Sequence, residues 1–318
     1  MAGQIGAGGG RLYPMIEPFD RRLIDRGDGH VLYVEQCGHP DGQPVIVLHG
    51  GPGGGCSPYM RRFFDPAHYR VVLFDQRGCG RSQPLASVMD NTTAHLLGDV
   101  AAIRAELDLG PAILFGGSWG ATLAVALAEA DPDSVTALVL RGVFLGQRRE
   151  LDWFYGGGAG RFFPDLWASF CAPIPEDERG DLIAAYHRRL FCGDPVREMR
   201  YAIPWLMWEN ALAGLETGTG GRVPGDYARI FARLENHYFA NACFLDEGQL
   251  LRERHRITHL PCIIVQGRYD MVCPPRTAWE LADGWDRCDL RMIPASGHAL
   301  SEPRIAAALV QAMDALAG

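Results

Sequence analysis

The sequence predicts an α/β fold built on a mostly parallel, doubly wound sheet, with a helical cap domain inserted into it. Helical patterns separate most of the strand-like segments, and residues 146–255 contain no strand-like segment at all. Six short segments are rich in Val, Ile and Leu throughout, which is typical of parallel strands that are covered on both faces. They span residues 44–50, 69–76, 111–117, 135–142, 261–267 and 290–298.

An earlier segment, HVLYVEQ (30–36), indicates an additional antiparallel strand at the edge of the sheet. The first helix is predicted after Thr92 or Thr93, because either hydroxyl can cap the helix N-terminus. Leu96, Leu97, Val100, Ile103 and Leu107 follow at helical spacing and share one face.

Three further helices complete the predicted sheet layers. Residues 121–130 are mostly small, so this helix can pack closely on a sheet; another helix follows Pro275, and the last spans 304–316. The insertion is rich in Trp, Tyr, Phe and Arg, with a predicted loop at 214–226. We therefore assign residues 1–145 and 256–318 to the core and 146–255 to the cap, which would cover the carboxyl ends of the strands, where open α/β sheets bind ligands.

Composition excludes several classes of function. The 318 residues carry 30 basic and 38 acidic side chains, a net charge of −8, and all the basic ones are Arg. Without lysine there is no Schiff-base or P-loop lysine, and the acidic balance argues against nucleic-acid binding. No apolar segment is long enough to cross a membrane, and the N-terminus lacks the apolar core of a secretion signal. Nine cysteines without a CxxC pair predict reduced thiols and a cytoplasmic protein.

The strongest catalytic motif is GGSWG (116–120), which lies between a predicted strand and a predicted helix. This context is the one that a nucleophile elbow requires: glycines permit the tight turn, and Ser118 is exposed at its corner. The alternative, a glycine-rich turn without chemistry, is less consistent with both flanks.

A serine hydroxyl needs a base to accept its proton. Asp270 follows the strand at 261–267, and His298 ends the segment at 290–298, in the order serine, acid, histidine that such folds use. Asp270 would orient His298, and His298 would transfer the proton. Taken singly, Asp270 could be a turn residue and His298 a surface histidine.

An acyl-transfer enzyme also needs N–H donors for the oxyanion. One is expected from Trp119, which follows the serine, and the other from Gly51 in HGGPGGG (49–55). A phosphate-binding loop is the competing interpretation. It is weaker because lysine is absent, the glycines do not fit GxGxxG, and Pro52 lacks an N–H.

These motifs together resemble the prolyl aminopeptidase (proline iminopeptidase) family of α/β-hydrolases. The resemblance is carried by HGGPGGG, FDQRGCGRS (74–82), GGSWG, GRYDMVCPP (267–275) and SGH (296–298), and extends from about residue 12 to 303. It implies release of N-terminal proline from small peptides, with no cofactor or metal. Nucleic acid and membranes are not expected partners.

The resemblance also gives the cap a role. In this family two cap glutamates hold the substrate's cationic amine, and WLMWEN (205–210) and RLENHYF (233–239) place them at Glu209 and Glu235. Charge pairing strengthens as water leaves a site, so a partly dry cap suits this task. Without the resemblance, both residues would be interpreted as solvated helix carboxylates.

The resemblance further implies an aromatic proline pocket that includes Phe144 and Phe154; packing within the cap is an equally good interpretation of both. Some relatives carry tyrosine at the second position, so a phenol contact is absent here. Cys273 lies near Asp270 in sequence and is expected to be a bystander thiol.

Other candidates are assigned structural roles. His255 and His259 stand four apart, but no glutamate follows His255 as HExxH requires, so a zinc site is not expected. Asp75, Arg77 and Arg81 in FDQRGCGRS are expected to brace the loop that follows their strand.

The sequence thus predicts a serine exopeptidase that releases N-terminal proline through an acyl-enzyme. An α/β-hydrolase acting on esters, acyl-amides or lactones is the alternative, and it would not need the cap glutamates. A ligand-binding relative without catalysis is a third possibility, but it would not need the Ser118, Asp270 and His298 set.

Overall fold

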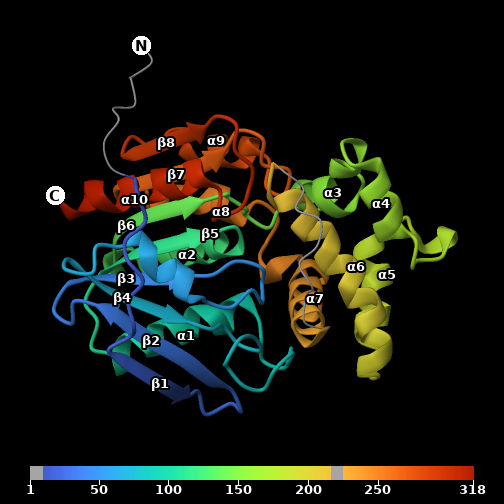
Figure 1. Ribbon diagram of the computed structural model, residues 1–318, viewed down its shortest axis with the longest axis horizontal. Helices are drawn as coiled ribbons and strands as arrows, with labels where there is room; N and C mark the ends of the chain where they lie inside the picture. The colour runs from blue at the N-terminus through green and yellow to red at the C-terminus, as the bar shows by residue number, and fades with distance from the viewer. Residues whose placement is uncertain (1–9, 216–224) are drawn as a thin grey trace.

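The computed structural model describes residues 10–215 and 225–318, so residues 216–224 of the predicted loop lie outside the described residues (Figure 1). The strands of the described residues form one sheet in the order β1-β2-β4-β3-β5-β6-β7-β8. This order and the helical layers on both faces confirm the predicted α/β-hydrolase fold.

The six predicted parallel strands are all present and pair in parallel. The strand that was expected to run toward His298 ends at Ile293, which leaves His298 in the loop beyond it. The strands are β3 (Gln43–Leu48), β4 (Tyr69–Phe74), β5 (Ala112–Gly117), β6 (Val135–Arg141), β7 (Cys262–Gly267) and β8 (Cys288–Ile293).

The antiparallel strand predicted at 30–36 is β2 (Val31–Gly38), which pairs with β4. Its predicted place at the sheet edge is wrong, because β1 (Asp20–Asp25) pairs antiparallel on its outer side. The sequence of β1, DRRLID, is mostly charged and exposed. Charged side chains are common on edge strands, where they discourage pairing with other chains, and here they hide the strand pattern.

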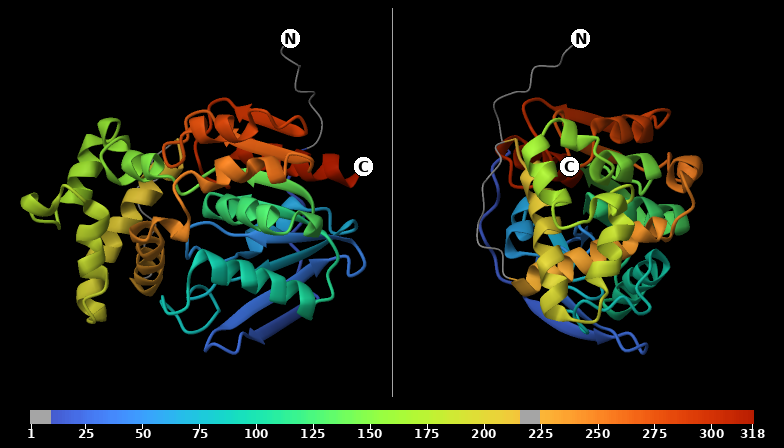
Figure 2. Two further views of the ribbon diagram at one scale, coloured as in Figure 1. Left: turned by 180° about the vertical axis from the view of Figure 1, so that it is seen from behind. Right: turned by 90° about the vertical axis from the view of Figure 1, so that its right-hand side faces the viewer.

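Helices cover both faces of the sheet (Figure 2). Core residues of α1 (Thr93–Glu106), α2 (Trp119–Ala130) and α9 (Pro275–Ala282) pack with Ile46 and Leu48 of β3. Core residues of α10 (Pro303–Ala317) and the short η1 (Pro58–Phe63) pack with Val45 and Val47 on the opposite face. Alternate residues of one strand therefore serve two hydrophobic layers.

The first of these helices begins as predicted. Thr92 caps α1, because its hydroxyl accepts a hydrogen bond from the His95 N–H. Leu96, Val100 and Ile103 are buried on the face toward the sheet.

Helices fill the chain between β6 and β7, and no strand occurs among the described residues there. Helices α3 to α7 stand together at one end of the sheet (Figure 1), whereas α8 packs against α2. The boundaries of the cap at residues 146 and 255 stay a prediction from the sequence. The helices are α3 (Arg148–Tyr155), α4 (Pro164–Cys171), α5 (Leu182–Leu190), α6 (Pro195–Ala213), α7 (Gly225–Ala240) and α8 (Gln249–Glu253).

None of the helices in the described part of the chain combines the length and the apolar content needed to cross a membrane.

The start of α2 packs backbone to backbone against β3 and β5. A Cβ atom at Gly120 would collide with the Leu48 carbonyl oxygen, and one at Gly116 would collide with the Gly120 carbonyl oxygen. These contacts leave no room for side chains, which is why the turn between β5 and α2 carries glycine at both positions.

Gly120→Ala is therefore expected to lower the free energy of unfolding by about 1–3 kcal/mol or more, because backbone must move to admit the methyl group. Gly98→Ala is the matched control. Gly98 lies inside α1, and nothing approaches its Cβ position within 4 Å. This control should stabilise the protein by about 0.5–1 kcal/mol. Urea unfolding measures both; equal effects would contradict the packing argument.

Candidate active site

Ser118 occupies the turn between the end of β5 and the start of α2. Its backbone φ of 58° and ψ of −123° are unusual for a residue with a side chain. Its N–H donates to the Arg141 carbonyl at 2.8 Å, so the turn is anchored to β6. Strained backbone of this kind is tolerated where the surrounding structure fixes it, and it is typical of a nucleophile elbow.

Asp270 and His298 meet beyond the ends of β7 and β8. His298 Nδ1 lies 2.7 Å from Asp270 Oδ2, and both side chains are buried. The other carboxylate oxygen accepts the N–H groups of Val272 and Cys273 at 3.0 and 2.7 Å, and Gln266 Nε2 donates to Oδ2 at 3.1 Å. The carboxylate is therefore fixed by donors on several sides, as an orienting acid requires.

Gly142 lies between the serine and the histidine. The Ser118 N–H donates a hydrogen bond to the carbonyl of Arg141, the residue before Gly142. A Cβ atom at Gly142 would lie 2.7 Å from His298 Nδ1 and Cε1. Among the described residues, no hydrogen bond joins the Ser118 hydroxyl to His298. In enzymes without substrate this bond is often long, and it tightens in the complex.

Gly51 and Trp119, the expected oxyanion donors, flank the serine. Gly51 lines the same pocket as Ser118. Trp119 is the first residue of α2, and the first N–H groups of a helix have no acceptor within that helix. A Cβ atom at the neighbouring Gly50 would lie 3.3 Å from Ser118 Cβ, so the two loops are in contact.

Asp75 braces the glycine-rich loop. Its Oδ1 accepts the Cys56 N–H at 2.7 Å, and its Oδ2 accepts the N–H and the Nε–H of Arg81, both at 2.8 Å. Burial alone would raise the pKa of Asp75, but these donors hold it below its ordinary value. Arg77 forms a separate buried ion pair with Asp99.

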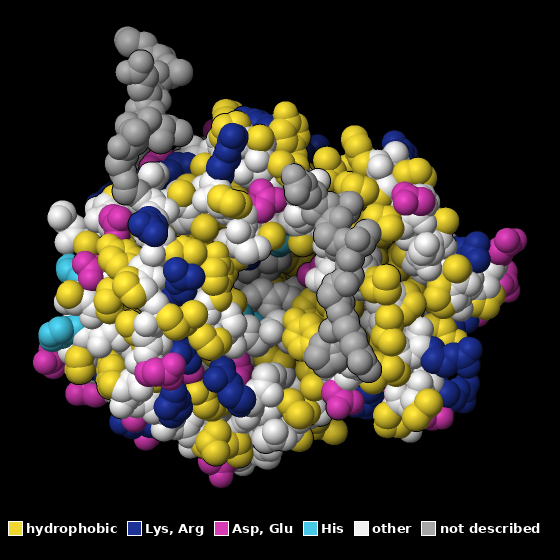
Figure 3. Space-filling view, in the orientation of Figure 1, with side chains coloured by type: hydrophobic (Ala, Val, Ile, Leu, Met, Phe, Trp, Pro, Cys, Tyr) yellow, Lys and Arg dark blue, Asp and Glu magenta, His cyan; other side chains and the backbone are white. Residues whose placement is uncertain are grey.

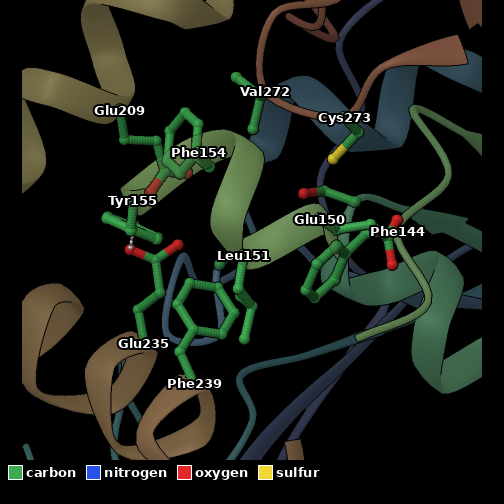
Figure 4. A pocket seen from close by; sticks show the side chains of 12 residues that line it. Phe144, Glu150, Leu151, Phe154, Tyr155, Glu209, Glu235, Phe239, Val272 and Cys273 are labelled. Atoms are coloured by element: carbon green, nitrogen blue, oxygen red, sulfur yellow. Dashed lines mark hydrogen bonds between the residues drawn. The ribbon is translucent and has the colours of Figure 1, made fainter. Parts of the chain in front are cut away.

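Two carboxylates from α6 and α7 meet on the other side of the pocket. Glu235 Oε2 accepts hydrogen bonds from Trp205 Nε1 at 2.5 Å and from the Tyr155 hydroxyl at 3.1 Å. Glu209 Oε2 is buried without a partner among the described residues. Glu209 and Glu235 were expected as solvated carboxylates on residue patterns alone, whereas the structure turns both into one pocket (Figure 4).

Both carboxyl groups hold protons more tightly than usual. Burial, together with the charge of Glu235, raises the pKa of Glu209 well above its ordinary value. Burial also raises the pKa of Glu235, to about 7, although hydrogen bonds to the carboxylate oppose the shift. Two carboxylates this close cannot both ionise easily, so the pair is suited to a cation that replaces the missing counter-charge.

A pocket of about 330 Å³ joins the serine to the carboxylate pair. The surface is hollowed where the sheet meets the insertion (Figure 3). Phe144 and Phe154, the two residues that the resemblance assigns to a proline pocket, line this pocket together with Cys273 (Figure 4). Burial raises the pKa of Cys273 well above its ordinary value, so the thiol is neutral and not a nucleophile.

Five lining residues were not predicted, and one of them is Val272, which precedes Cys273. Phe239 lies one turn after Glu235 on α7, and this i, i+4 spacing was a usable signal. Tyr155 and Leu151 lie on α3, whose sequence gives no direct indication of a pocket. Glu150 also lines the pocket, and burial raises its pKa to about 7, but its carboxylate accepts the N–H groups of Leu145 and Gln147, which precede α3.

The C-terminal end of α6 touches the histidine loop. The Ala213 carbonyl accepts the N–H groups of His298 and Ala299, at 2.9 and 2.7 Å. The Glu302 carboxylate spans the same junction, accepting the Gly297 N–H at 2.8 Å and the Leu215 N–H at 3.0 Å. The helix that carries Glu209 is thereby bonded to the loop that carries His298.

Among the described residues, no group of three or more His, Cys, Asp or Glu side chains is placed to hold a metal ion. His255 lies in the 3-10 turn Arg254–Arg256, and its Nδ1 contacts the Arg252 carbonyl.

The sequence matches the family described as alpha/beta hydrolase fold over residues 43–304. It is 50% identical over 311 residues to a proline iminopeptidase of Xanthomonas citri, covering 96% of this chain and 99% of the relative. A proline iminopeptidase of Arabidopsis thaliana is 46% identical over 96% of this chain and 83% of its own length.

Solved structures agree on the fold. An esterase from a Rhodococcus species gives a TM-score of 0.62 at 21% identity, covering 93% of this chain and 98% of its own. A proline iminopeptidase-related protein from Thermus thermophilus gives a TM-score of 0.60 at 24% identity, covering 94% of this chain and 97% of its own.

The carboxylate pair should make stability depend on pH. A carboxyl whose pKa is raised by folding, here from 4.5 to about 7 for Glu235, keeps a proton that the unfolded chain has lost. The free energy of unfolding should therefore fall as pH rises from about 5 to 8, and Glu235→Gln should make this slope shallower. Urea unfolding at several pH values measures it.

Glu178→Gln is the control for this measurement. Arg189 and Arg188 lower the pKa of Glu178 to about 2, so it is ionised throughout this range in both states. Its substitution should leave the slope between about pH 5 and 8 unchanged. Identical slopes for Glu235→Gln and the parent protein would contradict the assigned burial of this carboxylate.

Proposed function

The chain belongs to the proline iminopeptidase family of α/β-hydrolases, and we propose that it releases N-terminal proline from peptides through an acyl-enzyme on Ser118. The observation that carries this proposal is the pair of buried carboxylates, Glu209 and Glu235, in the same pocket as the serine. A hydrolase of neutral esters has no use for such a pair, whereas a substrate with a free amine needs it.

In the proposed acylation step, His298 takes the Ser118 proton as the oxygen attacks the prolyl carbonyl carbon. The oxyanion that forms accepts hydrogen bonds from the N–H groups of Gly51 and Trp119. Asp270 stabilises the imidazolium through the 2.7 Å contact with Nδ1. His298 then gives its proton to the leaving amine, which departs as the shortened peptide.

Deacylation repeats these roles with water. His298 takes a proton from the water as it attacks the ester carbonyl, the same N–H groups hold the second oxyanion, and Ser118 leaves with the proton from His298. Proline is released, and the serine is regenerated. Each of these roles is carried by a side chain or N–H of this chain.

Recognition of the amine explains why the reaction would stop after one residue. The secondary ammonium of the proline lies at the substrate terminus, and Glu209 and Glu235 close the pocket around it. A further residue on that nitrogen would remove the charge and would have to displace buried side chains, including Trp205, which donates to Glu235. The pocket therefore favours an exopeptidase.

The proline ring would occupy the aromatic part of the pocket. Phe144, Phe154 and Phe239 present apolar surfaces to it. Phe154 has no hydroxyl, but the neighbouring Tyr155 supplies a phenol, which donates to Glu235. The aromatic residues thus serve two tasks: packing on the ring and orienting the carboxylate.

We further propose a reducing compartment such as the cytoplasm, because all nine cysteines are free thiols. Small peptides with a free N-terminal proline are the proposed partners.

Loss of the nucleophile should abolish activity. Ser118→Ala is expected to lower kcat on prolyl-nitroanilide by roughly 10⁶-fold. Labelling by a fluorophosphonate should also disappear in this variant. Ser296→Ala, a buried serine in the histidine loop, should remain labelled and active. Labelling that persists in Ser118→Ala would place the nucleophile elsewhere.

Loss of the carboxylates should affect only substrates with a free amine. Truncating one partner of a buried charge pair usually costs about 2–5 kcal/mol, so Glu209→Gln and Glu235→Gln should reduce kcat/KM on prolyl-nitroanilide by at least roughly 30-fold. Their hydrolysis of a p-nitrophenyl ester should stay within a few-fold of the parent.

Glu176→Gln, on the exposed surface of the insertion, is the control and should leave both activities unchanged. Acetyl-prolyl-nitroanilide should be a poor substrate for the parent protein. Equal turnover of the acetylated and free-amine substrates would favour the ester- or acyl-amide-hydrolase alternative.

A further inference from the structure

Gln76 follows β4, and its side chain lies between the two loops that flank Ser118. Gln76 is 2% exposed, and three of its hydrogen bonds reach the segments on either side of the serine. The backbone N–H of Gln76 donates to His49 Nε2 at 3.0 Å. The side-chain amide donates through Nε2 to the His49 carbonyl at 2.9 Å, and its Oε1 accepts the Trp119 indole N–H at 3.0 Å. A carbonyl can only accept and an indole can only donate, so these neighbours fix the orientation of the amide.

The bond to His49 also determines which nitrogen of that imidazole carries the proton. His49 is buried, and burial lowers its pKa, so the ring is neutral. Its Nε2 accepts from Gln76, and a neutral ring then has its proton on Nδ1. Nδ1 is also the ring nitrogen that faces a carbonyl acceptor: it lies 2.9 Å from the Gly50 oxygen and donates to it, while the Gly55 N–H approaches the same nitrogen at 3.2 Å.

The Gly50 carbonyl is held by a second donor as well, the Gly54 N–H at 3.1 Å. The peptide bond between Gly50 and Gly51 is trans, because the cis bonds of the described residues are Gly51–Pro52 and Gln83–Pro84. In a trans peptide the C=O and the N–H point in opposite directions. Fixing the Gly50 oxygen therefore fixes the direction of the Gly51 N–H, the proposed oxyanion donor.

The second proposed donor is tied to the same amide. Trp119 contributes its backbone N–H to the oxyanion site, and its fully buried indole is bonded to Gln76. The indole also packs against Tyr238 of α7, with ring centroids 4.7 Å apart. One side chain thus bonds to both segments that supply the oxyanion donors.

We propose that Gln76 is a positioning residue of the oxyanion hole, which sets the relative placement of the Gly51 and Trp119 N–H groups without touching substrate. This inference rests on the proposed function, since that function assigns the two donors. Such donors act on the charge that develops in the transition state, and fixed geometry is what makes them effective. Gln76 should therefore influence the chemical step rather than substrate binding.

The test is Gln76→Met, which has a similar shape but lacks both polar atoms of the amide. We expect kcat to fall by roughly 100-fold, while KM for prolyl-nitroanilide stays within about threefold. A proline boronic acid, which mimics the tetrahedral intermediate, should bind more weakly by a similar factor. Inhibition by proline itself should be unchanged, because proline engages the carboxylate pair and not the oxyanion donors.

Gln36→Met is a matched control. Gln36 is also 2% exposed, and its amide bonds to Asp20 and Arg70 in β1 and β4, away from the site. It should lose stability on thermal unfolding and keep its kcat. If Gln76→Met does not fold, Gln76→Glu replaces it: this variant keeps the acceptor for Trp119 but places an oxygen against the His49 carbonyl, and it should show the same selective loss of kcat.

The proposal would be overturned by an unchanged kcat in a folded Gln76 variant, or by equal weakening of proline and boronic acid binding. A loss of kcat of the same size in Gln36→Met would also overturn it. Each variant is assayed on a p-nitrophenyl ester as well, since any acyl substrate needs the oxyanion donors. Failure of the parent protein on prolyl substrates alone would therefore refute the proposed function and leave the test of Gln76 intact.

Discussion

The close backbone contact between β3, β5 and the start of α2 is the constraint on which the rest of the site depends. Gly116 and Gly120 allow this contact, and it forces Ser118 into its unusual backbone conformation. The same contact brings the glycine-rich loop after β3 alongside the serine, so that nucleophile and oxyanion donors arise from one packing arrangement. The loop is then held from behind by Asp75 and Gln76, which follow β4 directly. The geometry of the candidate active site therefore depends on how the backbone packs at the carboxyl ends of the strands, rather than on any single side chain.

A second, independent constraint is electrostatic. Glu209 and Glu235 line one pocket, where burial raises the pKa of both carboxyl groups and the charge of Glu235 raises that of Glu209 further. Trp205 and Tyr155 stabilise one carboxylate, whereas Glu209 keeps an oxygen that no described residue partners. A buried acceptor without a donor is costly, and a substrate ammonium supplies the missing donors and charge together. The side chains of the pocket thus leave a deficit of donors and positive charge that a free N-terminal proline would correct.

The sequence was most informative where a local motif fixes backbone conformation. The elbow, the six parallel strands and the Asp270–His298 order are all local patterns next to strand ends, and strand ends converge at one edge of a parallel sheet. Strand β1 was not predicted, because its charged residues conceal the alternation of apolar and polar side chains that indicates a strand. Tyr155 and Leu151 of α3 could not be predicted as lining residues, because their position depends on how the helices of the insertion pack, and both would look the same in any buried helix. The carboxylate pair was accessible only through the family resemblance, since burial of a helix glutamate leaves no trace in its sequence.

The junction between α6 and the histidine loop connects the two constraints. Glu209 lies one turn before Ala213, whose carbonyl accepts the N–H groups of His298 and Ala299. The Glu302 carboxylate bridges Gly297 and Leu215 across the same junction. One helix thus carries Glu209, the proposed amine ligand, and holds the backbone of His298, the proposed general base, less than two turns away. Packed helices can transmit small displacements over such distances because protein interiors have low compressibility. The proposed division into a cap that recognises substrate and a catalytic core is therefore incomplete in this fold, because the helix proposed to bind the amine also supports the backbone of the proposed general base.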